Sequence, residues 1–284
     1  MSTYCGRHFS DTEINQIRQL MIDHPEYHRA DLSRHMCRIL QWYKADGGLK
    51  EMSCRVAMLR MHADGLIYLP APRRIKSPLT VIRFTTSTEP RNLLLQPLHQ
   101  LGALLLCKVE RQDSSLWNEY IERYHYLGYT PLPGAQLRYF VMHDQQIIAL
   151  LGFGAAAWQA APRDNYIGWT HALRKQHLQL VVNNARFLIL PWVQVKNMAS
   201  KILAMAAKQL PQDWQLQYKI TPVLLETFVE TDRFAGTCYK AANWVSVGTT
   251  KGRGKLGPSG KQSVPIKELL LYPLNSRFRK ILTS

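Results

Sequence analysis

An ordered alternation of short apolar segments and amphipathic segments between residues 102 and 272 most constrains the fold of this chain. Apolar runs rich in β-branched and aromatic residues predict strands, and runs with apolar residues three and four positions apart predict helices. Such alternation favours an α+β class domain, or an α/β one, around a central mixed sheet. The predicted strands are 102–109, 137–142, 147–158, 186–190, 223–229, 244–249 and 268–272, and the predicted helices are 114–126, 165–180, 198–210 and 233–242.

The first 70 residues instead predict three helices followed by a short strand. Ser10, with Glu13 three positions later, matches a capping box at the start of the first helix. The second helix is predicted from Ala30 to Gly47, the third at 49–64 and the strand at 66–70. The residues predicted to face inward are Ile14, Ile17, Leu20 and Met21 in the first helix, Leu32, Met36, Ile39 and Tyr43 in the second, and Met52, Val56, Leu59 and Ala63 in the third.

Three short helices and a strand are the elements of a winged helix-turn-helix, whose third helix enters the major groove of DNA. A small helical bundle with solvated charges is the alternative, and the basic stretch after the predicted strand favours DNA. We therefore interpret 1–75 as a winged-helix-like module, 76–98 as a proline-rich linker and 99–284 as a second domain. The predicted phosphate contacts of the module are Lys50, Arg55, Arg60, Arg73 and Arg74.

The charge of the chain predicts a polyanionic partner. Lys and Arg number 36 against 20 Asp and Glu, a formal net charge of +16. A positive field attracts nucleic acid, and the release of condensed counterions stabilises the complex. A basic surface kept for solubility is the weaker alternative, because acidic surfaces serve solubility better. The five scattered cysteines, the absence of a secretory signal and the lack of an apolar run of about 20 residues predict a reduced, cytoplasmic protein outside the membrane.

The order of elements in the second domain resembles the GNAT acyltransferase fold. Residues 187–191 and 199–203 are similar to the strand and helix that flank the acetyl-CoA pyrophosphate, and 238–244 to the late helix, where a tyrosine such as Tyr239 often serves as general acid. GNAT enzymes place glycines between that strand and helix, so that backbone N–H groups approach phosphate. Residues 192–198 contain no glycine, which argues against an acetyl-CoA site.

A resemblance to the DruA family, named for the Druantia anti-phage system, covers most of the chain. It is carried by residues 54–70, 123–129, 163–169, 184–191, 225–229, 234–244 and 248–254. The resemblance implies a role in phage defence or with mobile elements, since some members are joined to transposases. It also implies partners among defence or transposition proteins, and it implies no established reaction.

Asp164, Glu226 and Tyr239 are the candidate catalytic residues. Asp164 precedes a predicted helix, where an N-cap is the structural alternative. Glu226 lies within an apolar strand, so its carboxylate pairs with an arginine, Arg163 or Arg186, or works as a base or metal ligand. Two such carboxylates could hold Mg²⁺ for phosphodiester cleavage. No closely spaced carboxylate or histidine cluster predicts a metal site.

Lysine and arginine interleaved with glycine at 251–255 predict a flexible cationic loop that can approach phosphate. Lys251, Arg253 and Lys255 are its cations, and Arg163 and Arg186 are predicted to add nucleic-acid contacts. Nearby aromatic residues are expected either to stack on unpaired bases or to lie in the core. These aromatic residues are Tyr124, Tyr126, Trp158 and Trp169.

Together these features predict a DNA-binding protein of a phage-defence system or a mobile element. The alternatives are a nuclease or transposition enzyme, dependent on divalent metal or on a covalent tyrosine–DNA adduct, and an acyltransferase.

Overall fold

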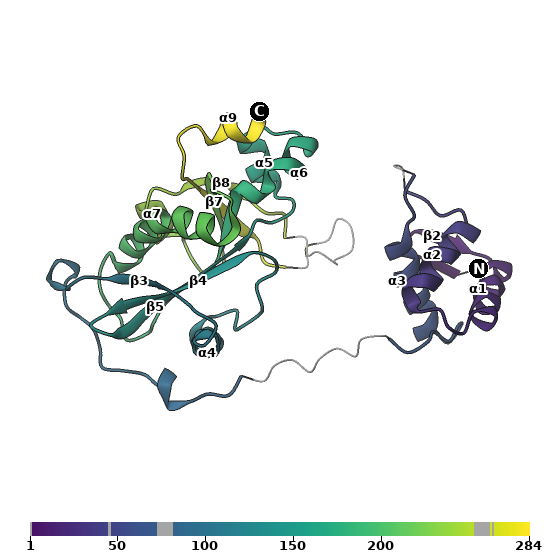
Figure 1. Cartoon of the computed structure of the whole chain (residues 1–284), viewed down its shortest axis with the longest axis horizontal. Helices are drawn as coiled ribbons and strands as arrows, with labels where there is room; N and C mark the ends of the chain where they lie inside the picture. Colours follow the sequence, from purple (N-terminus) through teal and green to yellow (C-terminus); the bar gives the residue numbers. More distant parts are fainter. Residues whose placement is uncertain (1, 45–46, 73–81, 253–261, 263) are drawn as a thin grey trace. The chain divides into compact units, whose positions relative to one another are not determined.

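The computed structural model describes residues 2–44, 47–72, 82–252, 262 and 264–284. The chain divides into two compact units, Met1–Val81 and Ile82–Ser284, each with its own hydrophobic core (Figure 1). Four predicted phosphate contacts, Arg73, Arg74, Arg253 and Lys255, lie outside the described residues. No helix in the described part of the chain is long and apolar enough to cross a membrane.

The first unit begins with a hairpin, β1 (Ser2–Tyr4) and β2 (Arg7–Phe9), followed by α1 (Asp11–Asp23), α2 (Arg29–Ile39) and α3 (Glu51–Ala63). The predicted capping box is confirmed. The backbone N–H of Glu13 donates to Ser10 Oγ, and the backbone N–H of Ser10 donates to a Glu13 carboxylate oxygen. Ile14, Ile17 and Leu20 are buried on α1, as predicted, whereas Met21 is only partly buried.

The predicted end of the second helix at Gly47 is wrong, because α2 stops at Ile39. The chain turns there, and the backbone N–H of Trp42 donates to the carbonyl oxygen of Cys37. The turn allows the Trp42 ring to pack against Phe9, with ring centroids 5.7 Å apart. Ile39 and Tyr43, predicted to face inward, are exposed.

The predicted inward face of the third helix is also wrong. Met52 and Leu59 are exposed, and the buried residues of α3 are Cys54, Ala57, Met58 and Met61. Apolar residues occur on both sides of this helix, so the sequence periodicity does not select one face. The smaller Cys54 and Ala57 lie on the buried side, where short side chains permit close helix packing.

The strand predicted at 66–70 is absent, although those residues are described. Arginine side chains hold this segment in place through hydrogen bonds to its backbone carbonyl groups instead. Arg18 Nε donates to the carbonyl oxygen of Leu66, and Arg29 Nε donates to that of Pro70. The strand pair of this unit precedes the helices, so three helices are present and a winged helix is not shown.

The second unit contains a seven-stranded mixed sheet in the order β3-β4-β5-β6-β7-β9-β8. Neighbouring strands are antiparallel, except for the parallel pair β6 and β7. The α+β class predicted from the sequence is confirmed. The strands are β3 (Leu105–Lys108), β4 (Gln136–His143), β5 (Gln146–Ala155), β6 (Val181–Ile189), β7 (Leu224–Glu230), β8 (Val245–Thr249) and β9 (Lys267–Pro273).

Helices cover both faces of this sheet. Arg138 on β4 bonds to Asn118 on one helix, and its neighbour Tyr139 bonds to Asp213 on another. Because successive strand residues point to opposite faces, the two helices lie on opposite sides. The helices are α4 (Ser114–Tyr124), α5 (Ala161–Ile167), α6 (His171–His177), α7 (Met198–Tyr218), α8 (Thr237–Ala241) and α9 (Phe278–Thr283).

The single helix predicted at 165–180 is two helices and a 3₁₀ turn, Leu178–Leu180. Gly168 ends α5 in the left-handed conformation, with φ at 83°. Thr170 then caps α6 by accepting a hydrogen bond from the backbone N–H of Leu173. This break packs α5 and α6 beside α9 (Figure 1).

Part of the segment interpreted as a linker is bonded to the second unit. Glu119 on α4 accepts hydrogen bonds from the hydroxyl groups of Thr85 and Thr88. The backbone N–H of Leu94 donates to the carbonyl oxygen of Trp192, and the N–H of Gln194 returns a bond to Leu94. The compact unit therefore includes residues that precede 99.

The parallel strands β6 and β7 pair only at their beginnings. Val181–Asn183 lie opposite Leu224–Glu226, and beyond that point the two strands share no register. β6 continues beside β5, and β7 continues beside β9. Where β6 and β7 diverge, the side chains of one strand have no neighbour on the other. A cavity opens between the two strands at this point.

Candidate functional site

A cavity of about 1730 Å³ lies where β6 and β7 diverge. It exceeds the roughly 300–1,000 Å³ typical of small-molecule pockets. Its wall includes residues of both strands, the segment after α4, the start of α5, the loop that leads into α8, and residues 247–252 and 264–267. Six of the seven segments that carry the sequence resemblance contribute to this wall, although they are far apart in the chain.

A β-bulge brings two polar side chains of β6 that line the cavity onto the same face of the sheet. Gly152 of β5 pairs with Arg186 and Phe153 pairs with Asn184, so Ala185 is an extra residue. In a regular strand, residues three positions apart face opposite sides. The extra residue changes this alternation, and Asn183 and Arg186 therefore lie on the same face of the sheet. Both residues line the cavity.

Arg186 has no carboxylate partner within ion-pair distance among the described residues. It donates to the carbonyl oxygen of Ala185 at 2.8 Å and to the hydroxyl of Thr130 at 3.2 Å. Its Nε is buried without a hydrogen-bond partner. Burial lowers the pKa of the guanidinium, because removal from water disfavours the charged form. The cavity wall thus contains a half-buried cation whose charge is not compensated nearby.

The wall carries three other cations, Arg233, Lys251 and Lys267, and one carboxylate, Glu230, at described positions. Arg233 Nε contacts the Glu230 carboxylate at 3.1 Å, so that pair is internally balanced. The remaining described charges on the wall are positive. An anionic ligand would complement this field.

His125 lies next to Arg186 on the cavity wall. The backbone N–H of Leu127 donates to His125 Nδ1 at 3.2 Å, which places the ring proton on Nε2 in the neutral form. Burial, followed by the nearby Arg186 charge, lowers the pKa of His125 from 6.5 to about 4. His125 is therefore a neutral hydrogen-bond donor at neutral pH.

The depressed pKa of His125 predicts acid sensitivity. Between pH 6.5 and about 4, this position binds a proton in the unfolded chain and not in the folded one. Stability therefore rises with pH in this window and is lost as pH falls through it. We expect His125→Gln to lose less unfolding free energy than the wild type on acidification, as measured by urea denaturation. Identical pH dependence in both proteins would contradict this assignment.

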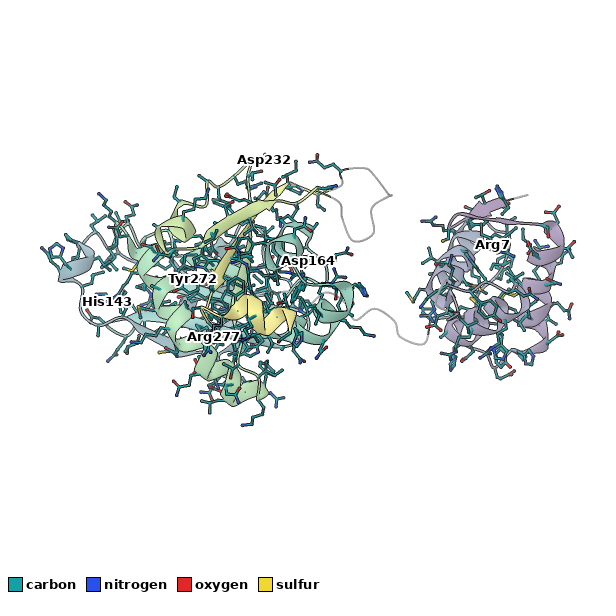
Figure 2. All side chains as sticks on the ribbon, turned by 90° about the horizontal axis from the view of Figure 1, so that it is seen from above. Arg7, His143, Asp164, Asp232, Tyr272 and Arg277 are labelled. Atoms are coloured by element: carbon teal, nitrogen blue, oxygen red, sulfur yellow. The ribbon has the colours of Figure 1, made fainter. Side chains whose placement is uncertain are left out.

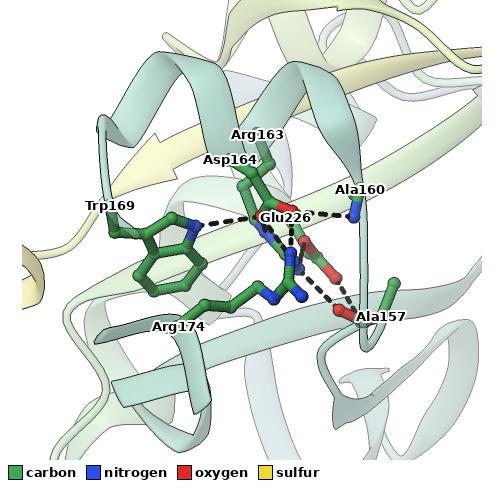
Figure 3. A network of polar contacts seen from close by, with 7 residues as sticks. All are labelled: Ala157, Ala160, Arg163, Asp164, Trp169, Arg174 and Glu226. Atoms are coloured by element: carbon green, nitrogen blue, oxygen red, sulfur yellow. Dashed lines mark hydrogen bonds and ion pairs between the residues drawn. The ribbon is translucent and has the colours of Figure 1, made fainter. Parts of the chain in front are cut away.

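The predicted residues Arg163, Asp164 and Glu226 form a buried polar network rather than part of the cavity wall (Figure 3). Arg163 is fully buried, and its NH1 group donates to a Glu226 oxygen and to the Ala157 carbonyl, both at 2.8 Å. The other Glu226 oxygen accepts the backbone N–H of Ala157. Of the two partners that the sequence left open, Glu226 therefore pairs with Arg163. The position of Arg163 argues against the predicted phosphate contact, because none of its surface is exposed.

Asp164 is equally engaged. One carboxylate oxygen accepts hydrogen bonds from Arg163 and from the Trp169 indole, and the other accepts from Arg174 and the backbone N–H of Ala160 (Figure 3). The suggested N-cap role is wrong, because Ala160 is the N-cap of α5 and Asp164 lies inside the helix. Asp164 is located among the packed side chains of the second unit (Figure 2).

These contacts leave the two carboxylates poorly suited to the Mg²⁺ site considered from the sequence. Each of their oxygens already accepts from an arginine or a backbone N–H. No group of three or more metal-ligating side chains occurs among the residues that the structure describes. These contacts are structural, because they join α5, α6 and β7.

Tyr239 lies on the cavity wall. It contacts Asn184, which pairs with Phe153, whereas Arg186 pairs with the preceding Gly152, so Tyr239 lies on the other face of β6 from Arg186. Its hydroxyl donates to Asn184 Oδ1 at 2.6 Å, and burial raises its pKa. A raised pKa favours the neutral hydroxyl, which can donate a proton but is a weak nucleophile.

The remaining predicted contacts are distributed over both units. Lys251 is exposed at the cavity wall. Arg60 is exposed on α3 of the first unit, and Lys50 and Arg55 are partly exposed there. Sequence reasoning did not identify Asn183, His125, Arg233 or Lys267 as site residues, because each becomes part of the wall only through the sheet and loop arrangement.

The aromatic residues considered for base stacking divide into two groups. Trp169 and Tyr124 are occupied in packing and hydrogen bonds, Trp169 with Asp164 and Tyr124 with the Thr88 carbonyl. Tyr126 is 38% exposed and lines the cavity, whereas the exposed Trp158 lies outside it.

A family model described as Druantia protein DruA matches residues 89–267 of the chain. No curated protein is a significant match. All of the described residues of the cavity wall lie within the matched range.

Several solved structures are similar to part of this chain. Spermidine N-acetyltransferase from Vibrio cholerae is 13% identical, with 62% of this chain and 95% of that chain covered and a TM-score of 0.39. An acetyltransferase of the GNAT family from Streptococcus pneumoniae is 11% identical, covering 61% and 100%, with a TM-score of 0.41. An aminoglycoside acetyltransferase in complex with coenzyme A is 12% identical, covering 63% and 99%, with a TM-score of 0.43. Identity at this level concerns the fold and not the substrate.

Proposed function

The chain belongs to the DruA family of Druantia defence proteins, and we propose that it is a DNA-binding protein of that system that engages DNA through the cavity between β6 and β7. The observation that carries the proposal is the positive charge of the cavity wall, above all the uncompensated Arg186. A buried cation is costly to retain without a partner. A phosphate of the ligand would supply the missing negative charge and two acceptors for the guanidinium fork.

The two enzymatic alternatives have weaker structural support. Phosphodiester cleavage by a metal requires carboxylates with free oxygens, and those of Asp164 and Glu226 are occupied by internal donors. Acyl transfer from acetyl-CoA requires free backbone N–H groups after β6. In that loop the N–H groups of Val193, Gln194 and Met198 already donate to backbone carbonyls.

We further propose that α3 of the first unit and its N-cap residue Lys50 provide a second, non-specific contact, with Arg55 and Arg60 as the cations of the helix. None of these three forms an ion pair among the described residues. Phosphate contacts of this kind position a protein on DNA and carry no sequence information. We propose that other Druantia proteins are its protein partners.

A salt titration tests the DNA-binding proposal. We expect the logarithm of the affinity for a short labelled oligonucleotide to fall linearly with the logarithm of salt concentration. Lys251→Gln should make the slope shallower by roughly 0.7–0.9, because one phosphate contact is lost. Lys208→Gln is the matched control, because Lys208 is exposed on α7 and outside the cavity wall. Fluorescence anisotropy provides the measurement, and the absence of binding at low salt would overturn the proposed function.

A further inference from the structure

The cations of the cavity are recessed, which bears on the form of DNA that can reach them. Arg186 is only partly exposed and lies on the sheet itself, at the β-bulge, rather than on a surface loop. The phosphates of an intact duplex lie on the outside of a stiff, wide helix. An unpaired nucleotide can enter a concave site, as the extruded nucleotide does in base-flipping enzymes.

Two aromatic rings lie on the same wall and are only partly covered. Phe234 is 48% exposed and Tyr126 is 38% exposed. Their ring centroids are 5.1 Å apart in a T-shaped contact, and the Arg233 guanidinium lies 5.4 Å from the Tyr126 ring centroid. Arg233 is itself paired with Glu230, at 3.1 Å. Exposed rings beside a cationic groove are the usual platform for the stacking of unpaired bases.

A third group on the wall has unused hydrogen-bonding capacity. The side-chain oxygen of Asn183 is buried and has no partner among the described residues. An amide provides a donor and an acceptor side by side, which matches the edge of a nucleic-acid base. The bulge at Ala185 places this amide on the same sheet face as the Arg186 guanidinium.

Arg186 and Tyr126 are close enough to interact. Burial raises the pKa of the Tyr126 hydroxyl, and the charge of Arg186 opposes this shift. Both residues also line the cavity. The phosphate-binding and base-stacking groups therefore lie within one site. His125, which immediately precedes Tyr126 in the sequence, lies on the same wall and adds a neutral Nε2 donor.

From this arrangement we propose that the cavity binds an unpaired nucleotide of a DNA strand, with its phosphate at Arg186, its base on the Phe234–Tyr126 pair and its base edge at Asn183. The proposal rests on the proposed function and specifies its substrate class. It requires single-stranded DNA, or duplex DNA with an unpaired nucleotide, to bind more tightly than a blunt duplex.

The test compares a single strand, a blunt duplex and a duplex with a one-nucleotide overhang in binding to the full-length protein. Loss of one stacked base weakens binding roughly 5- to 150-fold. We expect the blunt duplex to bind more weakly than the other two by a factor in this range. Phe234→Ala should abolish that difference without weakening blunt-duplex binding, and Phe234→Trp should preserve it. Trp158→Ala is the control, because Trp158 is an exposed aromatic residue outside the cavity wall.

Equal binding of all three DNA forms would overturn the nucleotide site and leave the proposed DNA-binding function intact. If Phe234→Ala weakened the binding of all three DNA forms by the same factor, the nucleotide site would likewise be overturned and the DNA-binding function left intact. Binding of a free deoxynucleoside monophosphate as tight as that of the strand would overturn the assignment to DNA. Quenching of a fluorescent base analogue at the overhang, lost in Phe234→Ala and retained in Trp158→Ala, would support stacking on this pair.

Discussion

Arg163→Met is expected to destabilise the second unit by about 3–5 kcal/mol, the usual cost of removing one partner of a buried ion pair. Methionine occupies a similar length but supplies no donor. The substitution therefore leaves the fully buried Glu226 carboxylate without its cation and removes two of the hydrogen bonds to Asp164. Urea denaturation, followed by the tryptophan fluorescence of the second unit, measures the change.

Arg174→Met is the matched control, because Arg174 bonds only to Asp164 in this network. We expect it to cost less than Arg163→Met. The double variant Arg163→Met with Glu226→Leu should recover part of the loss, because no charge then remains unpaired at the fully buried site. A loss below about 1 kcal/mol for Arg163→Met would contradict a structural role for the network.

Arg186→Gln is expected to weaken DNA binding roughly 10- to 150-fold, the range for loss of hydrogen bonds to a charged group. Its effect on stability should be opposite to that of Arg163→Met. Arg186 is half-buried without a carboxylate partner, so its removal relieves a desolvation penalty. We expect the unfolding midpoint of Arg186→Gln to stay unchanged or rise, as at other functional sites where stability is lower than it could be.

Arg138→Gln is the control for this variant. Arg138 and Arg186 both pair with Gly152, so they lie in one cross-strand row on the same face, and burial lowers the pKa of both. Arg138 bonds to Asn118 and Ser114 and lies outside the cavity wall. We expect Arg138→Gln to bind DNA normally. If both variants lost the same DNA affinity, the loss would reflect the lower net charge of the protein and not a contact made by Arg186 in the cavity.

Much of the second unit could be predicted from the sequence, because its strands and most of its helices are specified by local patterns. The strand predicted at 137–142 corresponds to β4, Gln136–His143. The first unit was harder to predict. In α3 the apolar residues occur on both sides, and only packing against α2 selects Cys54 and Met61 over Met52 and Leu59.

The candidate site could be predicted only in part. The sequence showed that a carboxylate at Glu226 inside an apolar strand needs a partner, because an isolated buried charge is too costly. It could not choose between Arg163 and Arg186, since both are arginines far from Glu226 in the chain. The choice determines their roles, because the arginine that pairs with Glu226 becomes structural and the other stays available to a ligand.

Local signals therefore account for the capping box at Ser10, the strand and helix alternation and the excess of positive charge, since each depends on neighbouring residues or on composition alone. The divergence of β6 from β7, the bulge at Ala185 and the pairing of Arg163 with Glu226 depend on the folded chain. Each joins residues that are tens of positions apart, and their energies arise from burial and register. Those long-range contacts create the cavity and leave Arg186 on its wall without a counter-charge.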